Sequence, residues 1–277
     1  MSDAPPLGLI AGNGRFPFLV ARGARRAGRR IVAVAIREEA APEIESEADE
    51  THWVSLGQLG RCIEALRASG VHEAVMAGQV KHRQIFSGIV PDLKLAGVLV
   101  RLAVKNTDSL IGGVADALRR EGITLLPSTA LLGDQMATPG AMSRRKPGSD
   151  ERKDIDYGVK VARTLSALDL GQTVVIKDRA AVALEAMEGT DEVIRRAGRL
   201  AGPGTTVVKL AKPRQDMRFD VPVVGVRTLE AMREAGARTL AVEAGRTLLI
   251  DRAAVLAAAD EAGLAIWGIG AADEAEA

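Results

Sequence analysis

The feature that most constrains the fold is a pair of fully apolar runs near the start of the chain, at Leu7–Ala11 and Ile31–Ile36. A helix is predicted between them over residues 16–27, after a short glycine turn. Strands that lack polar alternation are typical of a parallel sheet whose two faces are both covered by helices. This β-turn-α-β unit therefore predicts a doubly wound α/β domain.

The same alternation continues through the first half of the chain. The predicted elements are helices over residues 59–68, 93–105 and 108–120, and strands over residues 73–77 and 123–126. Strands that alternate with helices in this way indicate βαβ units. We predict an N-terminal Rossmann-like domain with a parallel sheet over residues 1–133.

A change of composition separates this part from the rest. Residues 136–154 are rich in Pro, Gly, Ser and charged residues and have no hydrophobic period, so we predict a linker over residues 134–154. Beyond it, helices are predicted over residues 155–168, 192–200, 228–235 and 252–262, and strands over residues 174–176, 206–210, 239–242, 247–250 and 264–267. The fold class is therefore α/β with two domains, the second being a mixed-sheet α/β domain over residues 155–277.

Charged residues gather in the stretch 209–225, which reads KLAKPRQDMRFDVPVVG. Pro213 and Pro222 disfavour a helix there, so its middle is predicted to be extended or irregular. Two carboxylates and up to four cations then stand beside an apolar strand, namely Lys209, Lys212, Arg214, Asp216, Arg218 and Asp220. An extended chain directs the last four of these to one side. Such a cluster suits a phosphate-bearing substrate, a metal ion or both, and an ion-paired surface connection is the equally weighted alternative.

Two short turns at the carboxyl ends of predicted strands are candidates for binding a phosphate group. They consist of Gly12, Asn13 and Gly14 after the first strand, and of Gly78 and Gln79 after the strand at residues 73–77. Glycines let a backbone approach phosphates closely, and ligands of open α/β sheets bind at this edge, so we expect both turns to line one crevice. The dinucleotide pattern is incomplete because Pro17 stands in place of its third glycine, and a plain strand-to-helix turn is the alternative.

Composition and charge exclude several classes of protein. The net charge of +1 and the scarcity of aromatic residues (two Trp, one Tyr and four Phe) argue against a nucleic-acid partner. The single cysteine, Cys62, is predicted to be a core residue, and a chain without disulfides favours a reducing compartment. The three histidines are not at metal-ligand spacing, so neither zinc nor serine-triad chemistry is expected. We see no signal peptide and no run long enough to span a bilayer, and expect a cytoplasmic protein.

Seven motifs, taken in order, resemble one known family. They are LGLIAGNGRFP, VMAGQVKHRQIF, KNTDSLIGGVADALRREG, LDLGQTVVI, ALEAMEGTDEVIRRA, KLAKPRQDMRFDVPVVG and AVEAGRTLLIDR. Together they are similar to the LpxI-type UDP-2,3-diacylglucosamine pyrophosphatases of lipid A biosynthesis, and the resemblance extends over residues 7–268.

The resemblance implies magnesium-assisted hydrolysis of the pyrophosphate bond of UDP-2,3-diacylglucosamine, which yields UMP and 2,3-diacylglucosamine 1-phosphate (lipid X). The family's catalytic aspartate lies in an R-x-D-[LV]-P motif that matches residues 218–222, so Asp220 takes this role, as a metal ligand or as a general base. Mg²⁺ is the implied cofactor, and its expected ligands are Asp220 with Asp216 or Asp191.

The matching motifs also supply the residues that are expected to contact the substrate. These are Gly12, Asn13, Gly14, Gly78, Gln79, Asp108, Gln172, Gly189, Thr190 and Lys212. Gln79 stands where the family commonly has Asn, and both amides can bridge donors and acceptors. Asp108 has the alternative role of capping its own helix.

The implied partner is a nucleotide-linked lipid with two acyl chains. Residues 93–104 or 180–187 are candidates for apolar cover of these chains, although each segment is more simply explained as core. The basic run 144–146 is a candidate for contact with anionic lipid, with a solvated linker as the alternative. A peripheral contact with the inner membrane surface and a homo-oligomer are left open. Two other functions also stay open, an NAD(P)-dependent oxidoreductase and a non-catalytic nucleotide-sugar binding protein.

Overall fold

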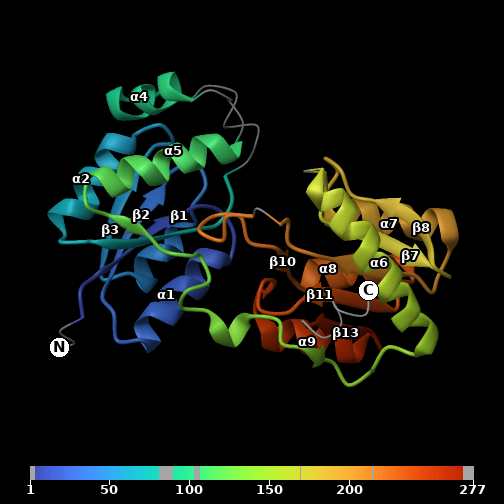
Figure 1. Ribbon diagram of the computed structural model, residues 1–277. Coiled ribbons are helices and arrows are strands. Elements are labelled where there is room, and N and C mark those ends of the chain that lie inside the picture. The colour runs from blue at the N-terminus through green and yellow to red at the C-terminus, as the bar shows by residue number, and fades with distance from the viewer. Residues whose placement is uncertain (1–3, 81–89, 103–106, 169, 214, 271–277) are drawn as a thin grey trace. The chain divides into compact units, whose positions relative to one another are not determined.

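Two units make up the structure, and the chain passes between them three times. The computed structural model describes residues 4–80, 90–102, 107–168, 170–213 and 215–270. One unit comprises Met1–Gly133 together with Asp216–Phe219, and the other comprises Asp134–Gln215 together with Asp220–Ala277 (Figure 1). They are named unit 1 and unit 2.

Unit 1 is built on a five-stranded sheet in which every pairing is parallel. Its strands, in spatial order, are β3 (Glu50–Val54), β2 (Ile31–Ile36), β1 (Leu7–Ala11), β4 (Glu73–Ala77) and β5 (Thr124–Leu125). This order, with the first strand in the middle, is typical of a Rossmann-like domain. The predicted parallel sheet is confirmed, and the side chains of β1 and β2 are buried along nearly the whole length of both strands.

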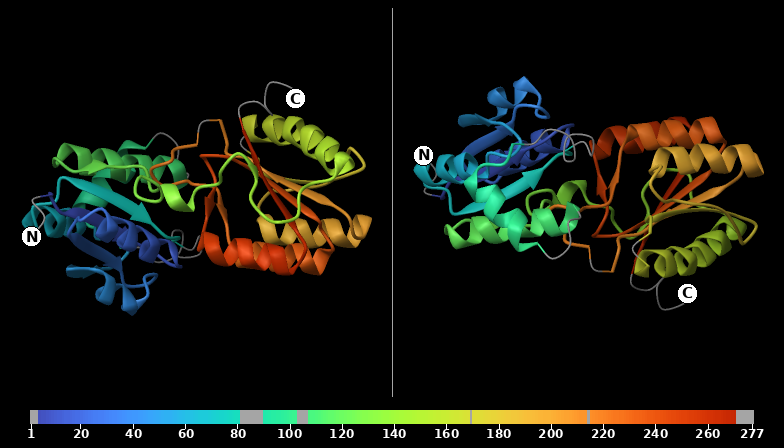
Figure 2. Two further views of the ribbon diagram at one scale, coloured as in Figure 1. Left: turned by 90° about the horizontal axis from the view of Figure 1, so that it is seen from below. Right: turned by 90° about the horizontal axis from the view of Figure 1, so that it is seen from above.

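Helices cover both faces of this sheet (Figure 2). α1 (Phe16–Arg26) packs on one face, against β1, β2 and β4. The core on the other face contains residues of α2 (Leu59–Ala68), α4 (Leu93–Arg101) and α5 (Thr107–Arg120). Cys62 of α2 lies in this core and is buried, so its predicted role as a core residue is confirmed.

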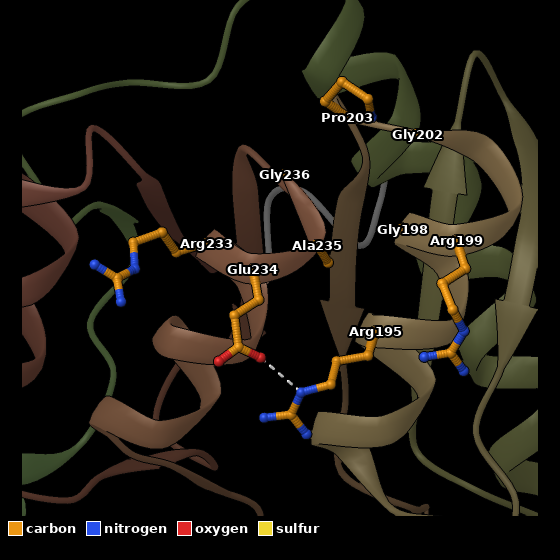
Figure 3. A pocket seen from close by; sticks show the side chains of 9 residues that line it. All are labelled: Arg195, Gly198, Arg199, Gly202, Pro203, Arg233, Glu234, Ala235 and Gly236. Carbon is orange, nitrogen blue, oxygen red and sulfur yellow. Dashed lines mark hydrogen bonds and ion pairs between the residues drawn. The ribbon is translucent and has the colours of Figure 1, made fainter.

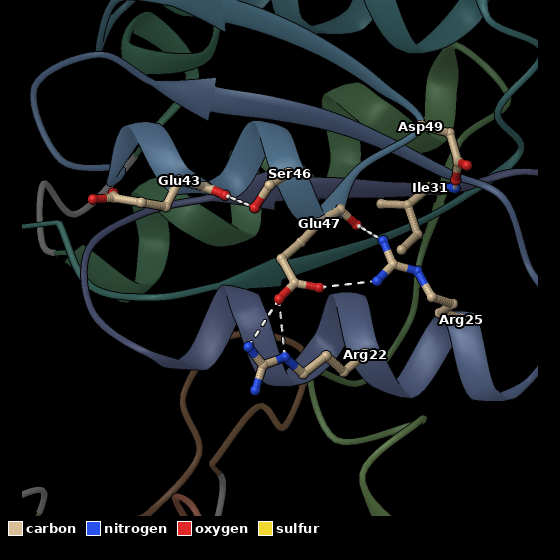
Figure 4. Close-up of polar contacts among 7 residues, drawn as sticks. All are labelled: Arg22, Arg25, Ile31, Glu43, Ser46, Glu47 and Asp49. Carbon is tan, nitrogen blue, oxygen red and sulfur yellow. Dashed lines mark hydrogen bonds and ion pairs between the residues drawn. The ribbon is translucent and has the colours of Figure 1, made fainter.

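The edge strand β3 is missing from the sequence prediction, because residues 50–54 read ETHWV and are mostly only partly buried. The short helix η1 (Pro42–Glu47) leads into it and is held against α1 by ion pairs (Figure 4). Glu47 Oε1 accepts hydrogen bonds from Arg22 Nε and Nη2 at 3.0 and 2.8 Å, and Glu47 Oε2 accepts one from Arg25 Nη1 at 3.1 Å. These ion pairs and the buried side chain of Ile44 together hold η1, which leads into β3, in place.

Unit 2 contains a six-stranded mixed sheet. Its strands, in spatial order, are β6 (Gly140–Ala141), β13 (Ala265–Ile269), β11 (Thr239–Glu243), β9 (Thr206–Lys209), β7 (Thr173–Lys177) and β8 (Ala180–Leu184). The central pairs β13–β11 and β11–β9 are parallel, whereas the outer pairs are antiparallel. The predicted mixed sheet is confirmed. Unit 2 also contains one separate pair of short parallel strands, β10 (Val223–Val224) and β12 (Leu248–Leu249).

Alternate residues of these strands belong to two cores, one on each face of the sheet. Val174, Ile176 and Val208 share a core with α6 (Ser149–Ala167). The neighbouring residues Val175 and Val207 belong to the other core, which is completed by α7 (Thr190–Ala201), α8 (Val226–Ala235) and α9 (Arg252–Glu261). Figure 2 shows α6 on one side of the sheet and these three helices on the other.

Residues 134–154 are not a linker, contrary to the prediction. The short helix η2 (Gly133–Gln135) is followed by β6, whose pairing with β13 makes this segment the edge of the sheet. α6 begins at Ser149, and its start is polar because Glu151 Oε2 accepts a hydrogen bond from Gly148 N at 2.7 Å in a cap. In the basic run 144–146, Arg145 pairs with Glu151 at 2.5 Å and Arg144 with Asp260 at 3.3 Å. The charged residues of this segment thus form caps and ion pairs within unit 2.

Candidate functional site

The two predicted turns of unit 1 lie side by side at the carboxyl ends of β1 and β4. Asn13 and Gln79 form an antiparallel bridge, in which Asn13 N donates to Gln79 O at 2.8 Å and Gln79 N donates to Asn13 O at 3.0 Å. Gly12 N also donates to Ala77 O at 2.8 Å. The two turns, which come from strands far apart in sequence, are therefore joined through their backbones, as expected from the parallel sheet.

Close backbone approach explains two of the glycines in these turns. A Cβ atom on Gly12 would lie 2.8 Å from Gln79 O, and one on Gly78 would lie 2.6 Å from Asn13 O. Gly78 and Gly14 also have positive φ angles of 97° and 93°, which strain any other residue. Around Gly14, in contrast, a Cβ atom would meet nothing within 4 Å, so the chain there borders open space. The turn therefore presents bare backbone at the start of α1, where a phosphate group is readily bound.

A polar cluster in unit 2 centres on Lys209, the last residue of β9. Lys209 has only 4% of its surface exposed, although its strand otherwise consists of threonine and valine. Its ammonium group donates a hydrogen bond from Nζ to Thr190 Oγ1 at 2.6 Å. Thr190 is the first residue of α7, so this bond joins the carboxyl end of a central strand to the start of a helix. Ligands of α/β sheets bind at such strand ends.

The hydrogen bonds continue from Thr190 to a buried carboxylate. Thr190 Oγ1 donates to Glu185 Oε1 at 3.0 Å, and Glu185 Oε2 accepts a hydrogen bond from Gln172 N at 3.2 Å. Thr173, the register partner of Lys209, places its hydroxyl 3.3 Å from that of Thr190. Buried polar groups in such a connected network hold one another in fixed positions. The cluster is thus preorganised within unit 2.

Negative charge exceeds positive charge around Lys209. Burial lowers the pKa of the Lys209 ammonium group, and the carboxylates of Glu185, Asp191 and Asp220 oppose this effect by their negative charge. One ammonium group is thus within electrostatic reach of three carboxylates, and these four groups alone carry two formal negative charges when all are ionised. Such an excess within a buried cluster is suited to a further cation.

Three of the predicted site residues at the start of α7 fall into this cluster. Gly189 precedes the helix with a φ of 84°, and Thr190 and Asp191 form its first turn. Asp191 Oδ1 accepts a hydrogen bond from Thr228 Oγ1 of α8 at 3.2 Å, which orients this carboxylate. Asp220 lies close enough to raise the pKa of Lys209. Thr190 is thus bonded to Lys209, and the carboxylates of Asp191 and Asp220 both lie within electrostatic reach of that lysine.

Gln172 and Lys212 lie beside the cluster. Gln172 Oε1 accepts a hydrogen bond from Gln215 Nε2 at 3.5 Å, and Gln172 N contacts Glu185 as described above. Lys212 N donates to Gln215 Oε1 at 2.7 Å, and Lys212 O accepts a hydrogen bond from Arg246 Nη2 at 3.2 Å. These contacts fix the backbone of the segment that leads from Lys209 toward Asp220.

The middle of the stretch 209–225 is irregular, which is one of the two conformations predicted for it, and the stretch ends in the short strand β10. Gln215 N donates to Lys212 O at 3.1 Å, and Phe219 N donates to Asp216 O at 3.2 Å, so the middle forms turns and the extended alternative does not apply. The side chains of Asp216 and Arg218 contact each other, but turns set their positions and the regular alternation of a strand does not. Arg214 lies outside the described residues.

Four residues of this stretch, Asp216–Phe219, belong to unit 1 although their neighbours on both sides belong to unit 2. Ser128 anchors them, because its N donates to Met217 O at 2.9 Å and its Oγ donates to Arg218 O at 2.5 Å. Phe219 packs against the core that contains α2 and α5. Asp220 is therefore the first residue after the chain returns to unit 2.

Asp216 is engaged by Arg218 and is a poor fit to a metal ligand. Its Oδ1 accepts hydrogen bonds from Arg218 N and Nε at 3.0 and 2.9 Å, and its Oδ2 accepts one from Arg218 Nη2 at 2.5 Å. These hydrogen bonds hold the pKa of the Asp216 carboxyl group below its ordinary value. Both carboxylate oxygens are thus already occupied by the neighbouring guanidinium group.

The donor set for a metal ion is restricted to a pair of carboxylates. Within the part of the chain that the structure describes, no group of three or more His, Cys, Asp or Glu side chains could hold a metal ion. Mg²⁺ is usually bound by one or two carboxylates, with substrate phosphates and waters as its other ligands. Asp191 and Asp220, which both act on the charge of Lys209, are the two carboxylates that remain for this pattern once Asp216 is set aside.

Two residues of the cluster, Lys209 and Glu185, were not predicted as site residues. Lys209 entered the sequence argument only as one cation among several, and Glu185 only as a position of the motif ALEAMEGTDEVIRRA with no role of its own. The one available signal was a lysine at the end of an otherwise apolar strand, since charged residues are almost never fully buried unless they are paired. Asp108 lies in the first turn of α5, and its side chain is outside the described part of the structure.

A pocket of about 500 Å³ lies elsewhere in unit 2, between α7 and α8 (Figure 3). It is lined by Arg195, Gly198, Arg199, Gly202, Pro203, Arg233, Glu234, Ala235 and Gly236. Arg195 Nε donates to Glu234 Oε2 at 2.7 Å, while Arg199 and Arg233 point away from each other. None of the predicted site residues lines this pocket, and its arginines do not converge on one point. We therefore place the candidate site at the Lys209 cluster.

Two family models match the chain almost end to end. The LpxI N-terminal domain matches residues 6–135, and the LpxI C-terminal domain matches residues 138–267. The chain is also 35% identical over 274 residues to the UDP-2,3-diacylglucosamine pyrophosphatase LpxI of Caulobacter vibrioides, covering 95% of this chain and 97% of that protein. No helix within the described residues has the length and apolar content needed to cross a membrane.

Solved structures show only a weak likeness. The biotin carboxylase–β,γ-ATP complex from Campylobacter jejuni is 13% identical with a TM-score of 0.29, and the match covers 72% of this chain and 42% of that chain. Rhizobium etli pyruvate carboxylase is 15% identical with a TM-score of 0.29, and the match covers 69% of this chain and 15% of that chain. Because these TM-scores are low, the likeness carries no argument about fold or function.

Proposed function

The chain belongs to the LpxI family, and on this ground we propose that it hydrolyses the pyrophosphate bond of UDP-2,3-diacylglucosamine. Water adds to one phosphorus and the bond from that phosphorus to the bridging oxygen breaks, which yields UMP and 2,3-diacylglucosamine 1-phosphate, an intermediate of lipid A biosynthesis. The observation that carries this proposal is the 35% identity, over 95% of the chain, to a UDP-2,3-diacylglucosamine pyrophosphatase.

The Lys209 cluster supports this chemistry in unit 2. A pyrophosphate diester carries two negative charges, so its hydrolysis needs fixed positive charge near the leaving phosphate. Lys209 supplies one such charge, and its hydrogen bond to Thr190 holds the ammonium group in place. Asp220, which lies near Lys209, is the residue on which we place the chemistry, since it occupies the aspartate position of the R-x-D-[LV]-P motif.

A magnesium ion would complete this site, held by Asp191 and Asp220. When bound, it would neutralise the pyrophosphate oxygens and stabilise the charge that develops on the leaving phosphate. Thr228 keeps the Asp191 carboxylate oriented by its hydrogen bond at 3.2 Å. Asp216 is left out of the proposed ligand set because Arg218 occupies both of its oxygens.

The paired turns of unit 1 are proposed to bind the nucleotide part of the substrate. Gly12, Asn13 and Gly14 offer backbone N–H groups and open space at the start of α1, and the bridge to Gln79 holds the turn in place.

Since the substrate carries two acyl chains, we also infer that the protein binds it at a membrane surface.

The test is to incubate the purified protein with UDP-2,3-diacylglucosamine and Mg²⁺ and to separate the products. Release of UMP together with 2,3-diacylglucosamine 1-phosphate is expected. The Asp220→Asn variant keeps the size of the side chain and removes its charge, so it should bind the substrate and release at most about a hundredth as much UMP. Asp134→Asn, at the start of unit 2 and outside the cluster, is the matched control and should retain activity.

Other outcomes would replace the proposal. Tight substrate binding without any turnover by the wild type would indicate a nucleotide-sugar binding protein. Bound NAD(H) in the purified protein, together with no UMP release, would instead indicate an oxidoreductase. Full activity of Asp220→Asn would move the chemistry to another residue.

A further inference from the structure

The exposed large apolar side chains of unit 1 gather at one place. Among its described residues they are Val90, Leu93 and Val100, with 83%, 93% and 86% of their surfaces exposed. Leu93 and Val100 belong to α4, and Val90 precedes this helix by three residues. Single exposed apolar residues are normal on a protein surface. Three of them within one nine-residue helix and the segment just before it form a concentrated patch.

α4 is apolar on both of its sides. Its inner side contributes Leu95, which is 8% exposed, and the partly buried Val98 and Leu99 to the core of unit 1. Its outer side carries Leu93, Gly97 and Val100, which are four and three residues apart and therefore form one stripe along the helix. A helix that is apolar all round is normally covered on all sides, so this stripe calls for a covering partner.

The helix is firmly attached, so the exposure of the stripe is a property of the fold. Asp92 caps α4, because its Oδ1 accepts a hydrogen bond from Leu95 N at 2.9 Å. The other oxygen, Oδ2, accepts one from Gly60 N at 2.6 Å and ties the cap to α2. Lys94 Nζ pairs with Glu121 Oε1 at 2.5 Å and attaches the helix near the end of α5.

Positive charge accompanies the stripe. Lys94 and Arg101 are exposed beside Leu93 and Val100, one at each end of α4. Lys94 and Arg67 share the one carboxylate of Glu121, so two cations meet a single negative charge next to this helix. Exposed apolar residues flanked by cations are typical of a helix that lies in the interface of an anionic membrane.

We propose that the outer stripe of α4, formed by Leu93, Gly97 and Val100 with Lys94 and Arg101 beside it, rests on the surface of an anionic lipid bilayer. The inference rests on the proposed function in one respect, namely that a substrate with two acyl chains is found in a membrane. A bilayer fits the stripe better than a protein does, because a stable protein interface buries about 800 Å² per partner and three side chains fall well short of that. A bilayer needs no complementary shape and takes up small apolar surfaces directly.

The experiment is flotation of the purified full-length protein with two kinds of vesicle. One contains phosphatidylethanolamine and phosphatidylglycerol, and the other contains phosphatidylcholine alone. The wild type is expected to float with the anionic vesicles and to bind the neutral ones several times more weakly. The double variant Leu93→Ser, Val100→Ser should lose about tenfold or more in binding, because two apolar side chains no longer enter the interface. Arg101→Gln should lose about fivefold, and only on anionic vesicles.

Matched controls separate a lipid contact from a general effect. Leu200→Ser removes an equally apolar side chain, 66% exposed, from α7 of unit 2 and should leave vesicle binding unchanged, whereas Leu93→Ser should weaken it. The Leu93 and Val100 side chains are exposed and contribute little to the core, so all these variants should melt at the wild-type temperature.

Three results would overturn the proposal. They are a wild type that does not float, a double variant that floats as the wild type does, and a double variant that changes from dimer to monomer in light scattering while its vesicle binding is unchanged. The last result would assign the stripe to a second copy of the chain. Hydrolysis of a water-soluble short-chain analogue of the substrate should be unaffected in the double variant. Vesicle binding without any hydrolysis by the wild type would refute the proposed function and leave this inference standing.

Discussion

Lys209 Nζ lies 2.6 Å from Thr190 Oγ1, so a buried ammonium group at the end of β9 is tied to the first turn of α7. The same threonine hydroxyl donates to Glu185 Oε1 at 3.0 Å. Since Asp191 follows Thr190 directly, this one hydrogen bond also sets where the Asp191 carboxylate lies relative to Lys209. Lys209 therefore organises the site of unit 2, because it supplies a positive charge and its hydrogen bond fixes the position of Thr190.

Replacing Lys209 with Met is expected to lower kcat by roughly a hundredfold, because one preorganised positive charge near the pyrophosphate is lost. Lys209→Arg should restore only part of the rate, since a planar guanidinium group does not fit the space of an ammonium group. Steady-state kinetics with UDP-2,3-diacylglucosamine measure kcat for both variants. Lys177→Met is the control, because Lys177 Nζ donates to the carbonyls of Ala201 and Pro203, at 2.7 and 2.9 Å, and belongs to no part of the Lys209 cluster described above. Equal losses in Lys177→Met and Lys209→Met would show that Lys209 acts through stability alone.

Removal of divalent cations with EDTA is expected to stop UMP release, and added Mg²⁺ should restore it. The variant Asp191→Asn should need about tenfold more Mg²⁺, or still more, for half-maximal rate, because one proposed ligand loses its charge. Asp216→Asn should need no more Mg²⁺ than the wild type, since Arg218 already occupies that carboxylate. A Mg²⁺ requirement that rises in Asp216→Asn and stays constant in Asp191→Asn would reverse the assignment.

The ion pair between Asp216 and Arg218 should make stability depend on pH in the acidic range. The pKa of Asp216 is lower in the folded protein than in the unfolded chain, so the unfolded state takes up a proton first as the pH falls. The stabilisation is therefore complete above the unfolded pKa of about 4 and is lost as the pH falls through the folded value. Asp216→Asn should lower the free energy of unfolding by up to about 1 kcal/mol at neutral pH and by nothing at low pH. Urea unfolding of both proteins across this range provides the measurement, and a difference that persists at low pH would contradict it.

Gly78→Ala should destabilise unit 1 by about 2–3 kcal/mol, because a Cβ atom there would lie 2.6 Å from Asn13 O and would also meet a φ of 97°. Gly70→Ala is the matched control. Gly70 has a φ of 72° but nothing within 4 Å of a new Cβ atom, so its replacement should cost only the backbone strain of about 1 kcal/mol. Urea unfolding compares the two. Similar losses would mean that the contact between the two turns can relax and that only the left-handed backbone requires glycine.

The Cys62 thiol should be unreactive in the folded protein. Burial raises its pKa to about 12, so at neutral pH the thiolate fraction is roughly a thousandfold below that of an ordinary cysteine. Iodoacetamide followed by mass spectrometry should find no label on the native protein and complete labelling in urea. Rapid labelling under native conditions would show that α2 opens readily, since Cys62 is 6% exposed in the structure.

Local patterns in the sequence identified most of the fold. The apolar runs at β1 and β2 predicted a parallel sheet, and the spacing of apolar residues over 59–68 predicted α2 with the bounds that the structure shows. These predictions succeeded because the hydrophobic pattern of a buried strand or an amphipathic helix lies in residues that are adjacent in sequence. β3 and the start of α6 were missed, since β3 is held by backbone pairing with β2 and the helix start by a cap, and neither contact leaves a hydrophobic period in the sequence.

For the candidate site, too, local sequence patterns identified some residues, whereas contacts between distant parts of the chain decided the surroundings of others. Asp220 and the two turns of unit 1 could be identified from motifs, because glycine and proline restrict the backbone locally and a motif occupies consecutive positions. Asp216 was grouped with Asp220 on the assumption of an extended chain, but turns and the anchor at Ser128 place Asp216 in unit 1 and Asp220 in unit 2. Two residues of like charge, four positions apart, thus have different surroundings.

By itself, the sequence determined the fold class, the family and the residue that we propose carries the chemistry, since each of these depends on the order of residues along the chain. Only the tertiary structure decided that Lys209 is buried and bonded to Thr190, that Glu185 and Asp191 face it, and that Arg218 engages Asp216. The physical reason is that burial and hydrogen bonding depend on how separate strands and helices pack. The carboxylates of residues 185, 191 and 220 come within electrostatic reach of Lys209 only once the segments that carry them are packed together in unit 2.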